Sequence, residues 1–199
     1  MSSILITGAA GFIGSALARR LISDGHKVVT IDNLSTGFKS AIPEGVEFYE
    51  GNCQDEVLIR KLEKYSFSAI FHIAGQSSGE ISFDDPVYDL QTNAQSTLLL
   101  LKLALKIGCQ QFIYASTMSV YGDKPDMPVL ENLELNPKSF YGVGKLASEH
   151  YLRIYQEFGI ISTAMRSSPC PVVMINGGGG VCCLINVSIN SLPLISGNE

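Results

Sequence analysis

Residues 4–14 read I-L-I-T-G-A-A-G-F-I-G, an apolar strand that runs into a glycine-spaced turn and then a helix. Each glycine meets a steric need: Gly8 permits the tight turn after the strand, Gly11 lets the backbone approach a pyrophosphate, and Gly14 lets the helix pack on the sheet. The start of the helix then directs free N–H groups at phosphate oxygens. This stretch predicts a dinucleotide-binding turn.

An acidic residue ends the next apolar stretch, K-V-V-T-I-D at 27–32. The Asp32 carboxylate can accept hydrogen bonds from both hydroxyls of an adenosine ribose, whereas a 2′-phosphate at that place would meet its negative charge. No arginine follows closely. We therefore expect NAD as the cofactor and not NADP. The plainer alternative, a glycine turn in an ordinary strand-turn-helix, leaves the acidic residue unexplained.

Six apolar stretches of strand character alternate with helical patterns along the chain. They lie at 4–7, 28–31, 46–49, 69–73, 112–115 and 162–165. This alternation predicts an α/β fold with a Rossmann-like, doubly wound parallel sheet. The 199 residues suffice for one well-buried domain, which we expect at residues 1–166.

Two helices are expected to frame this sheet. The first, after the glycine turn, has amphipathic spacing that predicts Ile13, Leu17 and Leu21 on its buried face. The longest is expected over 86–108, beginning at a proline and ending at a glycine. It is apolar on nearly all sides over 98–105, which implies cover from another loop or a partner subunit as well as the sheet.

The formal net charge is −5, with acidic and basic residues interspersed. No cluster of lysine and arginine occurs, so neither nucleic acid nor an anionic membrane surface is an expected partner. The apolar runs are interrupted by lysines or glycines, and no charged flank precedes the first of them. Neither a membrane span nor a secretory signal is therefore expected, and we predict a cytoplasmic protein.

The cysteines show neither C-x-x-C spacing nor pairing with histidines at metal-ligand spacing. They are Cys53, Cys109, Cys170, Cys182 and Cys183. We expect reduced thiols and no metal site. His72 lies inside the apolar run A-I-F-H-I-A and is expected to be a core histidine that bonds to its neighbours.

The second strong signal is Y-G-V-G-K at 141–145, followed by a helical pattern. Tyr141 and Lys145 are four residues apart and so share a helix face. A phenol with its pKa near 10 is a poor base at neutral pH, but a neighbouring ammonium, helped by a nicotinamide cation, lowers that pKa. Tyr141 can then take a proton from an alcohol. An exposed helical pair without a catalytic role is the alternative for these two residues alone.

Hydroxyl groups precede this pair in the sequence. The strand F-I-Y-A at 112–115 runs into Ser116 and Thr117. Their hydroxyls are expected at the carboxyl end of a central strand, where doubly wound sheets bind ligands. Thr117 is then expected to hydrogen-bond the reacting oxygen, and Ser116 to lie beside the cofactor.

Several motifs occur together in one order. They are T-G-A-A-G-F-I-G at 7–14, D-N-L-S-T-G at 32–37, F-H-I-A-G-Q-S-S at 71–78, A-S-T-M-S-V-Y-G at 115–122 and Y-G-V-G-K at 141–145. With this set the chain resembles the NAD-dependent sugar epimerase/dehydratase family, a group of extended short-chain dehydrogenases/reductases, over residues 1 to about 166. The resemblance implies NAD as the cofactor and Thr117, Tyr141 and Lys145 as catalytic residues.

The resemblance also implies a set of cofactor contacts, from the pyrophosphate turn through the adenosine ribose to the nicotinamide half. The expected cofactor-binding residues are Gly8, Gly11, Phe12, Ile13, Gly14, Asp32, Asn33, Leu34, Ser35, Thr36, Gly37, Asn52, Cys53, Ala74, Gly75, Asn93, Ser116, Tyr141 and Lys145. Where this chain has Asn52, the family usually has an acidic residue that accepts from the adenine amino group. The amide oxygen of Asn52 still accepts, so adenine recognition is expected to be weakened and not lost.

The residues after Thr117 bear on the reaction. Nucleotide-sugar 4,6-dehydratases of this family carry Asp-Glu there, because elimination of water needs an additional acid and base. Here the two places hold Met118 and Ser119. The resemblance therefore implies an isomerase, an NAD-dependent epimerase that acts at C4 of a nucleotide sugar, with a UDP-hexose expected, through a transient 4-keto sugar. The alternatives are another oxidoreductase or dehydratase of the family, and a non-catalytic NAD-binding protein.

The chain departs from the family after Arg166. Family members continue there with an aromatic-Asn segment and a Tyr-Gly-Pro turn, whereas this chain has S-S-P-C-P at 167–171. They also continue into a C-terminal substrate domain. We expect that domain to be missing or truncated, with 167–199 as its divergent or truncated start. Related proteins pair the helices near 88–107 and after Tyr141 into a four-helix bundle, so a homodimer is expected.

Overall fold

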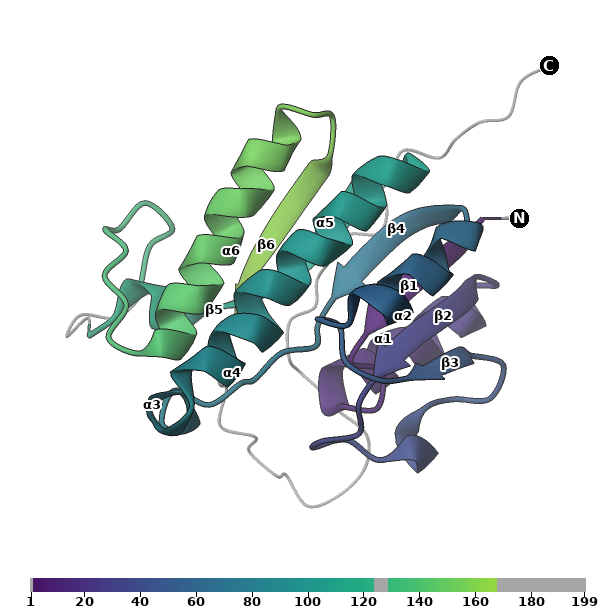
Figure 1. Ribbon diagram of the computed structural model, residues 1–199, viewed down its shortest axis with the longest axis horizontal. Coiled ribbons are helices and arrows are strands. Elements are labelled where there is room, and N and C mark those ends of the chain that lie inside the picture. Colours follow the sequence, from purple (N-terminus) through teal and green to yellow (C-terminus); the bar gives the residue numbers. More distant parts are fainter. Residues whose placement is uncertain (1, 124–128, 168–199) are drawn as a thin grey trace. The chain divides into compact units, whose positions relative to one another are not determined.

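The computed structural model describes residues 2–123 and 129–167 and contains a six-stranded parallel sheet (Figure 1). The strands are β1 (Ser3–Thr7), β2 (Lys27–Asp32), β3 (Glu47–Glu50), β4 (Phe67–His72), β5 (Gln111–Thr117) and β6 (Ile161–Ser167). Their order in the sheet is β3-β2-β1-β4-β5-β6. This is a doubly wound, Rossmann-like order, so the predicted fold class and the predicted strands are confirmed.

Helices lie on both faces of the sheet (Figure 1). They are α1 (Phe12–Ser23), α2 (Glu56–Lys61), α3 (Ile81–Asp84), α4 (Pro86–Leu90), α5 (Ser96–Ile107) and α6 (Phe140–Gln156), with short turns η1 (Lys39–Ala41), η2 (Leu62–Lys64), η3 (Gln91–Gln95) and η4 (Met118–Tyr121). On one face α2, α5 and α6 pack over Leu5 and Phe112. On the other face α1 packs over Ile6 and Phe71. Successive side chains of a strand point to opposite faces, which is why one sheet supports two cores.

Strand β1 lies between β2 and β4, at the point where the strand order reverses. At its carboxyl end Thr7 Oγ1 accepts hydrogen bonds from the backbone N–H groups of Ile73 and Ala74, each at 3.1 Å. This hydroxyl ties the end of β1 to the loop that follows β4. In open α/β sheets, ligands bind in the crevice at this edge, so the loop lies where a site is expected.

His72 is fully buried and bonded on both sides. Its Nδ1 lies 2.8 Å from Thr7 Oγ1, and its Nε2 lies 3.0 Å from Ser96 Oγ. Burial, together with the positive charge of Lys145, lowers its pKa to about 3, so the ring is neutral near pH 7. The predicted core histidine is confirmed. Cys53 and Cys109 are free and buried, and the other cysteines lie outside the described residues.

The helix predicted over 86–108 is present but irregular. Helix α4 passes into α5 through a π-helical turn at η3 (Gln91–Gln95). Hydroxyl side chains compete there for backbone carbonyls: Thr92 Oγ1 donates to Tyr88 O at 3.0 Å, and Ser96 Oγ donates to the carbonyl of Thr92 at 2.6 Å. Such bonds weaken the regular backbone ladder and favour a widened turn.

The buried stripe of α1 differs from the prediction at one place. Leu17 and Leu21 are buried, but Ile13 is 37% exposed, so its predicted place on the buried face is wrong. Gly14 and Ala18 complete the stripe instead. The reason is local, because in the first turn of α1 it is Gly14 that faces the preceding glycine turn.

Two kinds of feature are absent from the described residues. No helix there combines the length and the apolar character needed to cross a membrane. In the same part of the chain, no three His, Cys, Asp or Glu side chains come together as a possible metal site. The predicted C-terminal region 167–199 lies outside the described residues, apart from Ser167 at the end of β6.

Candidate functional site

The glycine turn after β1 has the geometry that its spacing predicts. Gly8 has a φ of +81°, and a Cβ there would lie 2.9 Å from the backbone nitrogen of Ala74. A Cβ on Gly14 would overlap the carbonyl oxygen of Gly8, so only glycine lets α1 pack this closely. A Cβ on Gly11 would meet nothing nearer than 3.4 Å. Packing therefore requires Gly8 and Gly14, whereas Gly11 leaves open space beside the turn.

Asp32 ends β2 with its carboxylate fixed by the backbone. Oδ2 accepts the N–H of Ala10 and Oδ1 accepts the N–H of Leu34, both at 2.8 Å. Each oxygen keeps a second lone pair, so the carboxylate can still accept from ribose hydroxyls. Leu34 has a φ of 58°, a left-handed conformation that costs a non-glycine residue about 1–2 kcal/mol. The bond to Asp32 holds this strained residue in place, and such strain is typical of functional segments.

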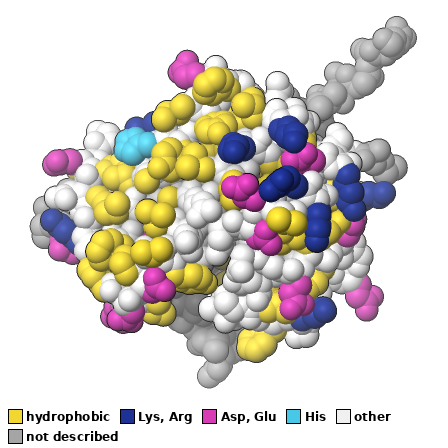
Figure 2. Space-filling view, viewed as in Figure 1, with side chains coloured by type: hydrophobic (Ala, Val, Ile, Leu, Met, Phe, Trp, Pro, Cys, Tyr) yellow, Lys and Arg dark blue, Asp and Glu magenta, His cyan; other side chains and the backbone are white. Residues whose placement is uncertain are grey.

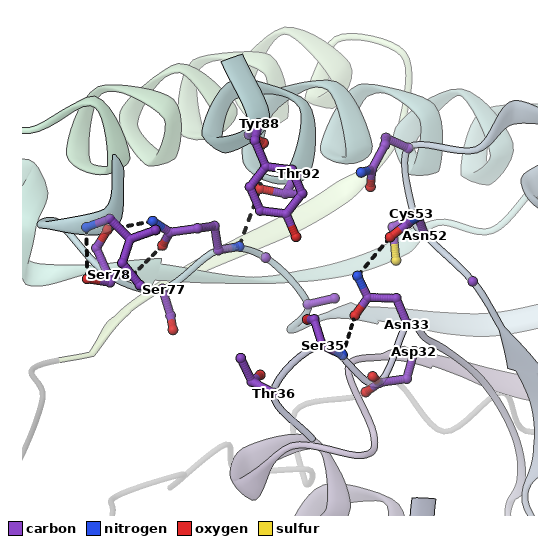
Figure 3. A pocket seen from close by; sticks show the side chains of 16 residues that line it. Asp32, Asn33, Ser35, Thr36, Asn52, Cys53, Ser77, Ser78, Tyr88 and Thr92 are labelled. Atoms are coloured by element: carbon purple, nitrogen blue, oxygen red, sulfur yellow. Dashed lines mark hydrogen bonds between the residues drawn. The ribbon is translucent and has the colours of Figure 1, made fainter. Parts of the chain in front are cut away.

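A pocket of about 210 Å³ lies beside Asp32 (Figure 3). The predicted cofactor residues that line it are Asp32, Asn33, Ser35, Thr36, Asn52, Cys53, Ala74 and Gly75. Lining residues that the sequence did not predict include Gln76, Ser77, Ser78, Ile81, Tyr88 and Thr92. The second group comes from the loop after β4 and from the helices that follow it, whose approach to the pocket depends on the tertiary fold.

Two amide side chains meet at one side of this pocket (Figure 3). Asn33 Nδ2 donates to Asn52 Oδ1 at 2.7 Å, and Asn33 Oδ1 accepts the N–H of Ser35 at 3.0 Å. One lone pair of Asn52 Oδ1 is thereby used and the other stays free for a ligand. Cys53 beside it is buried. Burial and, second, the negative charge of Asp32 raise the pKa of this thiol to about 12, so it is neutral.

Other predicted cofactor residues lie outside this pocket, among them Phe12, Ile13 and Gly37 near the glycine turn. Phe12 and Ile13 are exposed at the start of α1. A Cβ on Gly37 would lie 2.6 Å from the carbonyl oxygen of Ala10. Gly37 therefore lets the loop after β2 pass close to the glycine turn, which brings two of the predicted motifs together.

Tyr141 and Lys145 lie one turn apart on α6, as predicted. The helix begins at a cap, with Ser139 Oγ accepting the N–H of Gly142 at 3.1 Å. Both site side chains are buried, and Lys145 Nζ lies 5.8 Å from the centre of the Tyr141 ring. Nζ donates to the carbonyl oxygen of Ala115 at 3.0 Å. This bond fixes the ammonium at the carboxyl end of β5.

Thr117 is the last residue of β5 and is buried close to Tyr141. Its Oγ1 accepts the N–H of Ser119 at 3.1 Å, and its hydroxyl contributes a lowering of the pKa of Tyr141. Gly75 connects this group to the pocket, because a Cβ on Gly75 would lie 3.3 Å from Lys145 Nζ. The predicted catalytic residues are thus gathered at the end of β5, next to the loop that also borders the Asp32 pocket.

In the chain without its cofactor, burial dominates the pKa values of both residues. Burial raises the pKa of Tyr141 above its usual value, Thr117 lowers it, and Asp89 raises it. Burial also lowers the pKa of Lys145 to about 8, a shift that Asp89 opposes. The chain's own groups therefore do not lower the pKa of the phenol, because desolvation outweighs the lowering by the Thr117 hydroxyl.

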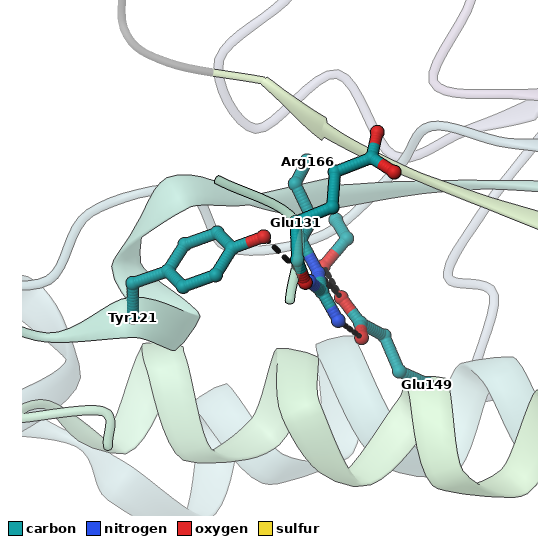
Figure 4. A network of polar contacts seen from close by, with 5 residues as sticks. Tyr121, Glu131, Glu149 and Arg166 are labelled. Atoms are coloured by element: carbon teal, nitrogen blue, oxygen red, sulfur yellow. Dashed lines mark hydrogen bonds and ion pairs between the residues drawn. The ribbon is translucent and has the colours of Figure 1, made fainter. Parts of the chain in front are cut away.

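A carboxylate and a guanidinium hold the end of β5 against α6 and β6 (Figure 4). Ser116 Oγ donates to Glu149 Oε1, and Arg166 Nη2 donates to Glu149 Oε2, each at 2.6 Å. Arg166 Nη1 also donates to the Tyr121 hydroxyl at 2.6 Å. Burial alone would raise the pKa of Glu149, but the bonds from Arg166 and Ser116 outweigh it and the pKa is lowered. Ser116, predicted to lie beside the cofactor, thus has its hydroxyl committed to this network.

Sequence reasoning missed Asp89. It lies on α4 and is buried, with Oδ1 accepting from Asn93 Nδ2 at 3.1 Å. Asn93, a predicted cofactor residue, is fully buried, and its Nδ2 also donates to the carbonyl of Gln76 at 3.1 Å. The available signal was the spacing of Asp89 and Asn93, which lie four residues apart on a predicted helix.

The residues present fit a dinucleotide. An acidic side chain with free acceptor capacity ends β2, open space lies at Gly11, and a buried Tyr-Lys pair ends the same ligand-binding edge. Fold and site together define a dinucleotide-binding domain of the extended short-chain dehydrogenase/reductase class. Similarity to known proteins identifies the family more specifically. The chain belongs to the NAD dependent epimerase/dehydratase family, whose pattern matches residues 4–169.

Named relatives agree with this family. A UDP-glucose 4-epimerase of Mycolicibacterium smegmatis is 39% identical over 158 residues, which are 76% of this chain and 50% of the relative. A crystal structure of UDP-glucose 4-epimerase from Thermotoga maritima with UDP-glucose matches with a TM-score of 0.79 at 36% identity, covering 82% of this chain and 54% of that one. The enzyme from Brucella ovis in complex with NAD matches with a TM-score of 0.78 at 34% identity, covering 83% and 51%. The chain thus spans about half the length of these relatives.

Proposed function

We propose that the chain is the NAD-binding part of a nucleotide-sugar 4-epimerase that acts on a UDP-hexose. The observation that carries the proposal is the convergence of Thr117, Tyr141 and Lys145 at the end of β5, on the same sheet edge as Asp32. The names of the relatives, and the NAD and UDP-glucose in their structures, support it. In this proposal residues 1–166 form the NAD-binding domain and 167–199 begin the substrate region; the cytoplasmic location stays a prediction.

The cofactor residues take distinct roles in this proposal. Asp32 accepts from the adenosine ribose, the turn at Gly8 and Gly11 receives the pyrophosphate, and the loop at Ala74 and Gly75 borders the nicotinamide. Bound NAD would supply the hydride acceptor and donor that an epimerisation without net oxidation requires. Tight retention of NAD follows from that chemistry, because no net oxidation occurs.

The proton chemistry belongs to the chain's own residues. Tyr141 Oη takes the proton of the sugar C4 hydroxyl, the Thr117 hydroxyl positions the reacting oxygen, and Lys145 stabilises the phenolate. The same proton transfer runs in reverse after the 4-keto sugar presents its other face. Since burial raises the pKa of Tyr141, the phenolate needs further positive charge, and an oxidised nicotinamide beside it would meet that need.

The residues of η4 favour epimerisation over dehydration. Dehydration across C5 and C6 needs a second acid and base close to Thr117. Met118 has no such group, and the Ser119 hydroxyl accepts from Thr117 Oγ1 at 3.2 Å. Neither side chain titrates near neutral pH, so these two positions provide no acid or base for elimination.

The test is turnover of UDP-sugars by the 199-residue chain with NAD. Interconversion of UDP-glucose and UDP-galactose without net NADH would support the proposal. Accumulation of NADH would indicate a dehydrogenase, and loss of water a dehydratase. Because the proposal makes the chain only the NAD-binding part, slow turnover is expected, and even slow epimerisation would eliminate the non-catalytic alternative.

A pair of tyrosine changes makes this test specific. Tyr141→Phe should lower the epimerisation rate by about a thousandfold, the usual range for a lost general base, and leave NAD bound. Tyr151→Phe, a half-buried tyrosine on the same helix, should change neither. Epimerisation retained in Tyr141→Phe would contradict the proposal.

We also propose that the chain pairs with a second copy through an apolar patch on α3, α4 and α6. The patch consists of the exposed side chains Ile81, Phe83, Val87, Leu90, Phe140, Val143 and Ile154. Figure 2 shows apolar side chains gathered on one half of the visible face, whereas most charged side chains lie on the other half of the same view. A self-complementary patch of this kind suits a twofold dimer.

Sedimentation at micromolar concentration tests the pairing. Val87 on α4 is 64% exposed within the patch, and Val57 on α2 is 60% exposed outside it. Val87→Lys should give monomers, whereas the matched change Val57→Lys should leave dimers intact. A monomeric wild-type chain would overturn the proposed dimer.

A further inference from the structure

Two buried ionisable side chains lie close to Tyr141, Lys145 on α6 and Asp89 on α4. Lys145 is 4% exposed and Asp89 is 1% exposed. Among the described residues, no ion pair within 4.0 Å includes either of them. A buried charge without compensation is strongly unfavourable, so each needs an opposite charge that acts across a longer gap.

Two glycines show that both groups belong to one small region. Asp89 Oδ2 faces α6 at Gly144, where a Cβ would lie 3.2 Å from it, and Gly144 directly precedes Lys145. Lys145 Nζ and Asn93 Oδ1 both face Gly75, since a Cβ there would lie 3.3 Å from Nζ and would overlap Oδ1. Asn93 Nδ2 in turn donates to Asp89 Oδ1. The carboxylate and the ammonium therefore flank the same asparagine.

Polar atoms in this region lack partners. Asp89 Oδ2 and Asn93 Oδ1 are buried, and neither has a hydrogen-bond partner among the described residues. An unpartnered buried carboxylate oxygen destabilises a fold unless positive charge lies near. Packing of α4 alone does not require a carboxylate at this place, because an apolar side chain would fill it without that cost.

We propose that Asp89 is a positioning residue that acts as the counter-charge of Lys145 and keeps its ammonium protonated beside Tyr141. The use of that ammonium rests on the proposed function, but its interaction with Asp89 does not. The effects of the two groups on each other agree in sign. Burial lowers the pKa of Lys145 to about 8 and Asp89 opposes the shift, while burial raises the pKa of Asp89 and Lys145 opposes it.

The other titratable groups that face Lys145 do not supply this negative charge near neutral pH. The pKa of His72 on β4 is about 3, so its ring is neutral. Tyr114 on β5, with its ring centre 4.8 Å from Nζ, has a pKa raised by burial, and so does Tyr141 on α6. Both phenols are therefore neutral as well.

Glu149, one turn further along α6, is an anion, but its carboxylate is already paired. Arg166 bonds both of its oxygens, and Ser116 donates to one of them. The guanidinium offsets its charge at close range. Asp89 is thus the anion on the described elements around Lys145 whose charge no cation pairs directly.

The test measures the pKa of Lys145 by ¹⁵N NMR of its Nζ in the lysine-labelled chain. The signal is assigned by its loss in Lys145→Met. Asp89→Asn keeps the size of the side chain and an acceptor for Asn93, and should lower the pKa of Lys145 from about 8 to about 7 or below. The matched control Asp85→Asn removes an exposed carboxylate one turn earlier, where asparagine also caps α4, and should leave that pKa unchanged.

An unchanged pKa of Lys145 in Asp89→Asn would overturn the proposal, even if the variant melts at a lower temperature. Should Asp89→Asn not fold, the reciprocal measurement decides: Lys145→Met should raise the pKa of the Asp89 carboxyl, followed by its ¹³Cγ shift. No rise would likewise overturn the proposal. Neither readout uses a sugar, so failure here is distinct from failure of the Tyr141→Phe test.

Discussion

At the end of β2 the backbone holds the site, whereas at the end of β5 side-chain charges hold it. Asp32 receives two backbone N–H bonds beside a strained Leu34. Around β5, by contrast, the strand end is fixed by the buried Glu149 and Lys145 and by the half-buried Arg166. The difference implies that the β2 end responds to changes of shape, and the β5 end to changes of charge and pH.

The largest effect on stability is expected from Arg166→Met, which tests the end of β5, where side-chain charges hold the strand. The change leaves Glu149 buried without its guanidinium and should lower the free energy of unfolding by about 3–4 kcal/mol. Urea unfolding measures this. In the matched control Arg60→Met, an exposed pair with Glu56 is lost, and the change should stay below about 1 kcal/mol. Equal effects of both changes would show that the buried network is dispensable.

The ion pair of Arg166 with Glu149 also predicts that stability depends on pH. The pKa of Glu149 in the folded chain lies below its usual value of 4.5, so its contribution is present above pH 4.5 and is lost as the pH falls through the folded pKa. Wild type should therefore lose stability in that acidic window. Arg166→Met should lose less there, because its Glu149 no longer has the guanidinium that lowers the pKa. Parallel pH curves for the two proteins would contradict this origin.

Two glycine substitutions test the end of β2, where backbone packing and backbone hydrogen bonds hold the site. Gly14→Ala places a Cβ on the carbonyl oxygen of Gly8 and should cost about 2–3 kcal/mol of unfolding free energy. Gly11→Ala should cost only about 0.5–1 kcal/mol, the usual penalty for alanine at a helix N-cap, yet weaken NAD binding. Urea unfolding and calorimetric titration with NAD separate these effects. A fully stable Gly14→Ala would show that the close packing is not needed.

Asp32→Asn should have an intermediate effect, of about 2 kcal/mol. An amide has a single acceptor oxygen, so either Ala10 or Leu34 is left with an unpaired N–H. The free energy of unfolding and the affinity for NAD should both fall. Asp24→Asn, an exposed residue at the end of α1, should leave both unchanged.

The smallest effect is a stabilisation. Leu34→Gly removes the left-handed strain and should raise the free energy of unfolding by about 1 kcal/mol or less, because glycine also gains entropy in the unfolded chain. Ser35→Gly, at the next position, gains no such relief and should destabilise. Thermal melting compares the two. A less stable Leu34→Gly would mean that the leucine side chain, and not the backbone, matters at this place.

The fold and the β2 end were predictable because they depend on short-range rules. Alternating apolar residues, a glycine turn and an acid after a strand carry their meaning in a few positions. The burial of Asp89 on α4 and of Glu149 on α6, and the pairing of Arg166 on β6 with Glu149, were not predictable, because charged side chains are normally exposed and are buried only when these elements pack together.

One expectation failed, and a second depends on the bound cofactor. The helical period placed Ile13 in the core, but which turn of α1 meets the glycine turn depends on the tertiary fold. The Tyr141 pKa was expected to fall beside Lys145 and a nicotinamide cation; in the chain by itself burial raises it, and the effect of the bound cation stays a prediction. Both depend on the surroundings of a residue and not on its spacing in the chain.

The π-helical turn η3 sets the angular phase between α4 and α5. One residue in an α-helix corresponds to a rotation of roughly 100°, so a regular helix through 91–95 would present α4 and α5 at a different relative angle. In that case either the Asp89 side chain would rotate away from α6, or Leu100 and Leu103 would rotate away from the sheet. The widened turn lets one continuous helix meet a polar neighbour at its start and an apolar one further along. Deleting a single residue there would force a choice between the two.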